Sequence, residues 1–282
     1  MELFPTTHIG DLAVSRLVIG TNWFLGYSHS SKAKDDFIKQ RQTRPRIAEV
    51  LEAFATEGVN VTLGARPDMP HFNEAIDDAE QATGTKIIRI GTPHLDLGES
   101  QEALDATARR LDDYAACGID VCMPHQCSTD ALVNRRTRRI DMMDVYCGMI
   151  RDRGMIPGLS THMPETPIYA DEQGLDVETY IQIYNAAGFL MQIEVDWVQR
   201  MIWQRRKPVL TIKPLAAGKV PPLVGLAFSW STIREQDLVA VGCLTADEAK
   251  EVVEISRAVL ERRVPNMDLQ VTRSKKSVMA GA

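Results

Sequence analysis

The chain has 282 residues, of which 44% are hydrophobic and 25% are charged. This composition is close to the average of globular domains, so it indicates a large buried core and argues against a disordered chain. The formal net charge is −6. Because domains that bind DNA or RNA are usually basic, we expect no nucleic-acid partner.

No apolar stretch reaches the roughly 18 residues that a membrane-spanning helix needs. The first residues also lack a basic segment followed by an apolar run. We therefore expect a cytoplasmic protein with no membrane partner. The five cysteines are an odd number in a chain without an export signal, which indicates reduced thiols.

Short apolar runs alternate along the chain with longer amphipathic segments, which is the pattern of βα units around a parallel sheet. Residues 1–16 come first, and Gly10 with Asp11 predicts the turn of a hairpin at the bottom of a barrel. The eight predicted strands cover residues 17–21, 59–64, 86–91, 119–123, 155–160, 190–195, 208–212 and 238–242. One such barrel needs about 250 residues. The predicted fold is therefore a single α/β domain, a (β/α)8 TIM barrel over residues 17–263, with a C-terminal tail over residues 264–282.

The segments between the strands carry helix signals. Apolar residues at spacings of three and four predict a helix over residues 99–116, with Ser100 as its N-cap. A second helix is predicted over residues 246–263, where Thr245 and Glu248 have the spacing of a capping box. Five glycines that precede predicted strands are expected to form left-handed helix C-caps: Gly58, Gly84, Gly118, Gly154 and Gly188.

Several segments resemble the aldo-keto reductase superfamily. HIGDLAVSRLVIGT resembles its hairpin and first strand, and YAACGIDVCMPHQCSTD resembles its fourth strand, which ends in a catalytic histidine. MQIEVDW, TIKPLAAGKV and VAVGCLTADEAKEVV resemble its sixth, seventh and eighth strands. The resemblance places His125 at the catalytic histidine. It also implies that Gly242 and Thr245 hold a phosphate of NADP at a helix start.

The chain departs from that family where the chemistry is done. Reductases of the family use an aspartate and a tyrosine after strand two and a lysine at the end of strand three. Here Thr62 or Leu63 replaces the aspartate, the following loop has no tyrosine, and Pro93 and His94 replace the lysine. Without that tyrosine and lysine, the usual mechanism lacks its proton donor. We therefore interpret the chain as a divergent member with another chemistry.

Histidines replace the missing residues at the predicted barrel mouth, where βα loops build active sites. His29 and His71 fall in the first two loops, and His94, His125 and His162 follow strands three, four and five. Glu194 and Asp196 end the predicted sixth strand. Neighbouring strands lie about 4.8 Å apart. The three strand-end imidazoles and the Glu194 carboxylate are therefore predicted to bind zinc, manganese, iron or nickel.

Other interpretations of these residues stay open. His125 would act alone as a hydrogen-bond donor or acid if it is only inherited from a reductase, and His94 and His162 would be ordinary loop residues beside proline. A register error of one residue would turn Glu194 toward the helices. Cys122 and Cys127 flank His125, but an isolated C-x4-C pair is a weak zinc motif, and we interpret both as buried small hydrophobes.

Further residues complete the predicted site. Lys213 ends the seventh strand and is expected to neutralise an anionic substrate; a Schiff base is the alternative. Asn22, Trp23 and Arg66 are expected to contact the substrate, with the Arg66 guanidinium holding a carboxylate or phosphate.

The leading functional hypothesis is a metal-assisted lyase, isomerase or hydrolase that acts on a small polar substrate, either carbohydrate-like or carboxylated. Asp196 or His29 would serve as the base. One alternative is an atypical NADPH-dependent oxidoreductase with His125 or His94 as its proton donor. The other is a non-catalytic binding protein built on a barrel scaffold. The sequence leaves oligomer formation open.

Overall fold

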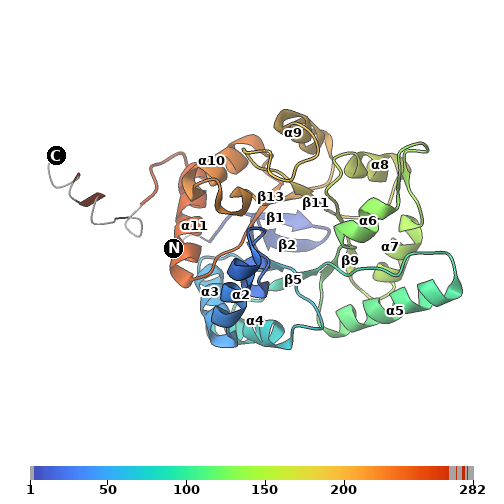
Figure 1. The fold of residues 1–282 in the computed structure, drawn as a ribbon, viewed down its shortest axis with the longest axis horizontal. Coiled ribbons are helices and arrows are strands. Elements are labelled where there is room, and N and C mark those ends of the chain that lie inside the picture. Colours follow the sequence, from blue (N-terminus) through green and yellow to red (C-terminus); the bar gives the residue numbers. More distant parts are fainter. Residues whose placement is uncertain (1–2, 267–270, 272–274, 277, 279–282) are drawn as a thin grey trace.

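A closed parallel barrel forms the centre of the computed structural model, which describes residues 3–266, 271, 275–276 and 278. Its strands in chain order are β3 (Leu17–Gly20), β4 (Val61–Leu63), β5 (Ile88–Gly91), β6 (Val121–Cys122), β9 (Ile156–Pro157), β10 (Leu159–Ser160), β11 (Tyr180–Ile183), β12 (Val209–Ile212) and β13 (Leu238–Val241). The pairing order is β10-β11-β12-β13-β3-β4-β5-β6-β9. The predicted α/β (β/α)8 barrel is thereby confirmed (Figure 1).

Each of the eight strand positions around the barrel is called a stave below. Strands β9 and β10 are the two halves of one stave and are separated by Gly158. A Cβ atom at Gly158 would lie 2.9 Å from the carbonyl oxygen of Thr179, so only glycine fits there. The first half pairs with β6 and the second with β11. The sheet therefore closes on itself with eight staves.

The predicted N-terminal hairpin is present and closes one end of the barrel. Strands β1 (Thr6–Ile9) and β2 (Leu12–Ser15) pair antiparallel around Gly10, which has a φ of 60°. Ile9 and Val14 are fully buried and form one apolar cluster with barrel-interior residues such as Val121 and Leu210. Figure 1 shows the hairpin at the centre of the ring of helices. The N-terminal hairpin is therefore the floor of the barrel.

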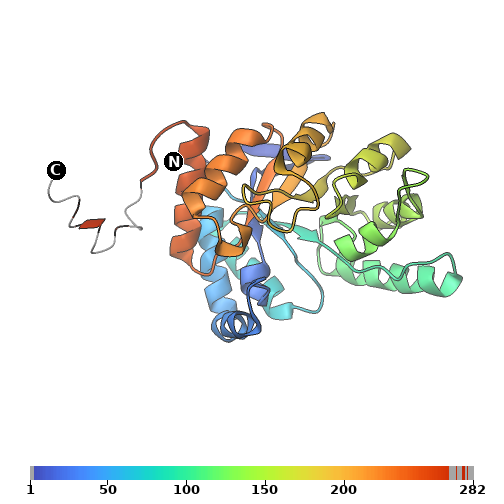
Figure 2. The same cartoon turned by 45° about the horizontal axis from the view of Figure 1, so that its top comes forward.

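Helices surround the barrel, and several short elements stand over its mouth. They are α1 (Asn22–Leu25), α2 (Lys32–Arg41), α3 (Arg44–Thr56), α4 (Pro70–Thr83), α5 (Gln101–Ala116), α6 (Gln126–Ala131), α7 (Met143–Arg151), α8 (Thr166–Gln173), α9 (Val195–Gln204), the 3-10 turn η1 (Ala216–Gly218), α10 (Pro222–Thr232) and α11 (Ala246–Leu260). A small hairpin of β7 (Val133–Asn134) and β8 (Arg139–Ile140) follows α6. Figure 2 shows α10, α11 and α3 side by side on one flank.

The predicted helix starts agree with the structure. The Ser100 hydroxyl accepts the N–H of Ala103 at the start of α5, and the Thr245 hydroxyl accepts the N–H of Glu248 at the start of α11. Gly58, Gly84, Gly118 and Gly154 all have positive φ. The fifth glycine, Gly188, also has a positive φ but lies in the loop after β11, not behind a helix.

The predicted sixth strand is wrong. Residues 190–194 form a loop, Val195 is the first residue of α9, and the sixth stave is Tyr180–Ile183. All four residues of that stave are buried, as expected for a parallel strand covered on both faces. In the segment MQIEVDWVQRMI the buried side chains are Val198, Met201 and Ile202, whose spacing is that of a helix.

The structure also locates His71 and part of the predicted C-terminal tail. His71 was predicted in a loop, but it lies in the first turn of α4. Of the predicted tail, residues 267–270, 272–274, 277 and 279–282 lie outside the described residues. Among the helices that the structure describes, none is both long and apolar enough to cross a bilayer.

Candidate active site

A cavity of about 1040 Å³ opens at the carboxyl ends of the barrel strands. This volume lies at the upper end of the range for pockets that bind small molecules. Nine of the predicted site residues line it: Asn22, Trp23, His29, Arg66, His94, His125, His162, Lys213 and Gly242. The barrel mouth therefore gathers residues from every part of the chain into one space.

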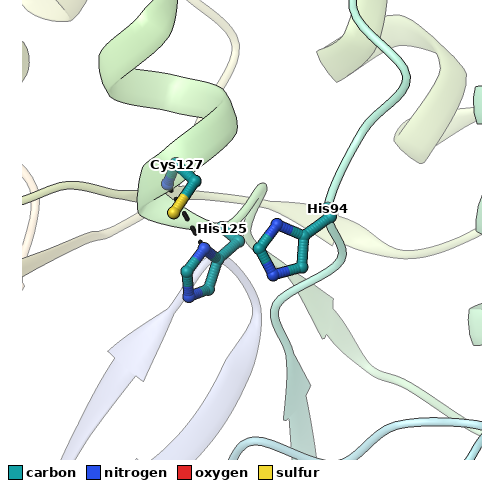
Figure 3. Close-up of side chains that lie close together, drawn as sticks. All are labelled: His94, His125 and Cys127. Atoms are coloured by element: carbon teal, nitrogen blue, oxygen red, sulfur yellow. Dashed lines mark hydrogen bonds between the residues drawn. The ribbon is translucent and has the colours of Figure 1, made fainter.

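His94 and His125 lie against each other at the ends of neighbouring staves. Their ring centroids are 4.2 Å apart and the rings are tilted by 36°. Cys127 is the third member of the group, since one ligand atom of each residue lies within 4.8 Å of the others (Figure 3). Cys127 is exposed, whereas Cys122 is buried, so the expectation that both are buried hydrophobes is wrong for Cys127.

The His125 side chain is also the N-cap of α6. Its Nδ1 accepts the backbone N–H of Cys127 at 3.2 Å (Figure 3). Nδ1 therefore keeps its lone pair, and Nε2 carries the ring hydrogen. Burial, with the nearby His94 and Arg66, lowers the pKa of His125 to about 4. The ring is thus neutral at neutral pH, which is the form that binds metals or accepts protons.

His162 lies in the same cavity but outside the group of His94, His125 and Cys127. Its backbone N–H donates to Asp130 Oδ2 at 3.1 Å, and the other oxygen of Asp130 accepts the Thr161 hydroxyl. Burial, then the charge of Lys213 and the rings of His125 and His29, lower the pKa of His162 to about 4. The structure therefore supplies a second neutral imidazole, but it does not place it as the third ligand predicted from the sequence.

A second group stands on the opposite part of the mouth, where loop one meets the end of β12. Lys213 Nζ lies 2.9 Å from His29 Nε2, and Asn22 Nδ2 lies 3.1 Å from the same nitrogen. Both Lys213 and His29 have a positive φ, 63° and 57°. Left-handed backbone is costly for such residues and clusters at functional sites.

Electrostatics set the charge of this pair. Burial lowers the pKa of Lys213 to about 8. Burial and the Lys213 charge lower the pKa of His29, while Asp35 opposes the shift. Asp35 itself accepts the backbone N–H and the hydroxyl of Ser28, at 2.7 and 2.6 Å, and so fixes the loop that carries His29. The sequence alone does not single out Asp35, because carboxylates are common on the exposed faces of helices.

Arg66 is occupied. Its Nε and Nη2 each lie 2.5 Å from one carboxylate oxygen of Asp68, which closes a two-point ion pair. The expected role of Arg66 as the group that grips a substrate carboxylate is therefore not supported while Asp68 holds it. Trp23 forms part of the cavity wall, and Lys34 Nζ lies 5.4 Å from the centre of its ring.

Solved structures with the same architecture include a protein from Pseudomonas aeruginosa described as a candidate aldo-keto reductase. It matches with a TM-score of 0.64 and 16% identity, over 90% of this chain and 96% of its own. The chain has the fold of the aldo-keto reductases. A glycerol dehydrogenase from Gluconobacter oxydans matches with a TM-score of 0.56, 16% identity and coverage of 93% and 96%.

Other barrels match more weakly, among them an orotidine 5′-monophosphate decarboxylase from Methanocaldococcus jannaschii, with a TM-score of 0.50, 12% identity and coverage of 85% and 96%. These neighbours are described as barrel enzymes, and at 12–16% identity they show the fold of this chain. No protein-family model and no curated protein sequence matches the chain.

The departures from the aldo-keto reductases hold in the structure. Thr62 is fully buried and its hydroxyl donates to the Ile19 carbonyl oxygen, so no carboxylate stands at that point. His94 lines the cavity where the lysine of those reductases was expected.

The start of α11 is unsuited to a phosphate. Its Thr245 hydroxyl already accepts the Glu248 N–H, and a Glu248 carboxylate oxygen accepts the Leu244 N–H at 2.7 Å. Glu248 and Glu251 both line this side of the cavity, so a phosphate would meet negative charge. Gly242 is needed because a Cβ there would lie 2.7 Å from Trp23 Cδ1. The phosphate-binding role expected of Gly242 and Thr245 is not supported.

Glu194 and Asp196 are displaced by the error in the sixth strand. Glu194 is the exposed N-cap of α9, and Asp196 is exposed in its first turn, where a carboxylate stabilises the helix dipole. Neither Glu194 nor Asp196 is among the described residues that line the cavity. The roles expected for them, metal ligand for Glu194 and base for Asp196, are therefore wrong.

Proposed function

We propose that the cavity is the active site of a metal-assisted lyase, isomerase or hydrolase for a small polar, carbohydrate-like molecule. The observation that carries the proposal is the group of His94, His125 and Cys127, whose ligand atoms lie within 4.8 Å of one another, with the two histidines lining the cavity. Two imidazoles and a thiol are a ligand set that suits zinc, and three protein ligands leave a position for a substrate or water.

Specific atoms of His125 and Cys127 would bind the metal ion. His125 would ligate through Nδ1, the nitrogen that keeps its lone pair, in place of its bond to the Cys127 N–H. Cys127 Sγ, which would be the third ligand atom, lies 2.8 Å from Gln126 Nε2. When bound, the ion would polarise a substrate oxygen or lower the pKa of a water.

The chain's own residues would move the protons. His29 Nε2 and Lys213 Nζ form a pair that exchanges one proton across 2.9 Å. His162 is a neutral ring at neutral pH and can accept a proton from a substrate. Trp23 and the Asn22 amide border the same space and would orient a hydroxylated substrate. The occupied Arg66 favours a neutral polar substrate over a carboxylated one.

Metal analysis of protein purified without chelator tests the proposal. We expect about one equivalent of zinc or another transition metal per chain, with a clear loss in Cys127→Ser and His94→Gln. His71→Gln is the matched control, because His71 lies in α4 outside the cavity lining. Metal-free protein that stays metal-free after incubation with zinc would refute the proposal.

A further inference from the structure

Lys213 stands where a covalent role is chemically accessible, beyond the proton exchange with His29 that the proposed function gives it. It follows the last residue of β12 and lines the cavity. Its Nζ meets His29 Nε2 at 2.9 Å. Among the residues that the structure describes, no carboxylate forms an ion pair with it, so the amine has no anionic partner that would hold its charge.

We propose that Lys213 forms a Schiff base with the carbonyl carbon of a small neutral hydroxy-aldehyde or hydroxy-ketone, with His29 as its proton acceptor. This inference uses the same cavity as the proposed function but does not depend on a metal. It assigns Lys213 a covalent role in place of the anion-binding role expected from the sequence.

The geometry around the amine supports this assignment. His29 Nε2 faces Lys213 Nζ and Asn22 Nδ2 together, so this nitrogen is an acceptor for both donors. Backbone of positive φ at both Lys213 and His29 shows that their placement is held against local strain. The low pKa of Lys213, about 8, leaves a sizeable share of neutral amine near neutral pH, whereas an ordinary lysine has almost none.

The chemistry balances within the pair. The Nζ lone pair attacks the carbonyl carbon, the C=O π electrons move to oxygen, and the oxygen takes a proton from the solvent to give a carbinolamine. The proton lost from nitrogen passes to His29 Nε2. His29 then returns it to the hydroxyl, which leaves as water while the nitrogen lone pair forms the C=N bond. The product is an iminium ion, and no oxidant or reductant is consumed.

The substrate class follows from the neighbours. Arg66 is closed by Asp68 through two contacts of 2.5 Å, so no free guanidinium is offered to a carboxylate there. Asp35 beside the His29 loop, together with Asp113, Glu248 and Glu251 elsewhere in the lining, disfavours anions. Trp23 and the exposed Tyr27 present aromatic surface beside the Asn22 amide, which suits a hydroxylated carbon chain.

Reductive trapping tests the proposal on the whole chain after chelator treatment. The protein is incubated with dihydroxyacetone and sodium cyanoborohydride, digested, and analysed by mass spectrometry. We expect the reduced adduct mainly on Lys213, and weaker labelling of Lys213 by pyruvate at the same concentration. His29→Gln should slow this labelling by about tenfold or more.

The controls separate a reactive amine from general lysine modification. Lys213→Arg should remove the dominant adduct, whereas Lys219→Arg should keep it, because Lys219 is exposed in the same segment and packs on Phe189. Equal labelling of exposed lysines, or none on Lys213, would overturn the proposal, and stronger labelling by pyruvate would overturn the neutral substrate class. Because metal has been removed, failure of the metal hypothesis leaves this readout unchanged.

Discussion

The two ends of the barrel are built by opposite rules. At the floor, Ile9 and Val14 of the hairpin pack on apolar residues from all eight staves, and every side chain of that cluster is almost fully buried. At the mouth, imidazoles and an amine share one cavity, and two of these residues, His29 and Lys213, have left-handed backbone.

This difference indicates that the floor of the barrel contributes to stability and that the mouth serves function. Burial of apolar area at the floor contributes free energy of folding, whereas burial of His125, His162 and Lys213 at the mouth disfavours their charged forms. Such groups lower stability and are retained where their reactivity is used. Changes at the floor should therefore alter folding alone, and changes at the mouth should alter binding and reactivity.

The largest effect is expected at the floor. Ile9→Ala removes a fully buried side chain and should lower the free energy of unfolding by about 2–5 kcal/mol. Urea denaturation measures it, with Val264→Ala as control because Val264 is 86% exposed. If metal content changed as much as stability, the separation of the two ends would be broken.

At the mouth, His94→Gln should lower zinc affinity by about a hundredfold or more, since losing an outer partner alone costs roughly 10–100-fold. A competition titration against a chromophoric chelator measures it. The urea midpoint of the metal-free protein should barely move, because His94 is exposed. An unchanged affinity would remove His94 from the ligand set.

The pH dependence of stability should report the buried rings. The pKa of His162 falls from 6.5 to about 4 on folding. The unfolded chain therefore binds a proton as the pH drops below 6.5 and the folded chain does not, so stability is lost over that window. The melting temperature of wild type should fall more than that of His162→Gln between pH 6.5 and 4, with no such difference in slope above pH 7. Parallel curves throughout would contradict the burial of this ring.

The smallest response is expected with NADPH. Glu248 and Glu251 beside the start of α11 should prevent its phosphates from binding, so the emission of the four tryptophans and the melting temperature should stay unchanged on titration. Saturable quenching by NADPH would restore the oxidoreductase alternative. The Glu248→Gln, Glu251→Gln double variant tests whether these carboxylates are the reason.

The architecture and most of the mouth could be predicted from the sequence, because repeated βα patterns and strand ends are local signals. The sixth stave could not, since YIQIY and MQIEV are both short apolar runs and only the helical spacing of Val198 and Ile202 distinguishes the second. Glu194 and Asp196 were misplaced with it. Cys127 was missed as a ligand because its approach to His94 is made by the turn into α6, and the Arg66–Asp68 pair depends on side-chain geometry that no spacing encodes.

Cobalt substitution tests the central claim most directly, because a thiolate bound to cobalt gives an intense charge-transfer absorption that imidazoles do not. Metal-free wild type titrated with Co²⁺ should develop this band and reach saturation at about one equivalent. Cys127→Ser should lose the band and His94→Gln should weaken binding, while His71→Gln should behave as wild type. A titration of the wild type without the charge-transfer band would contradict a metal centre built on His94, His125 and Cys127.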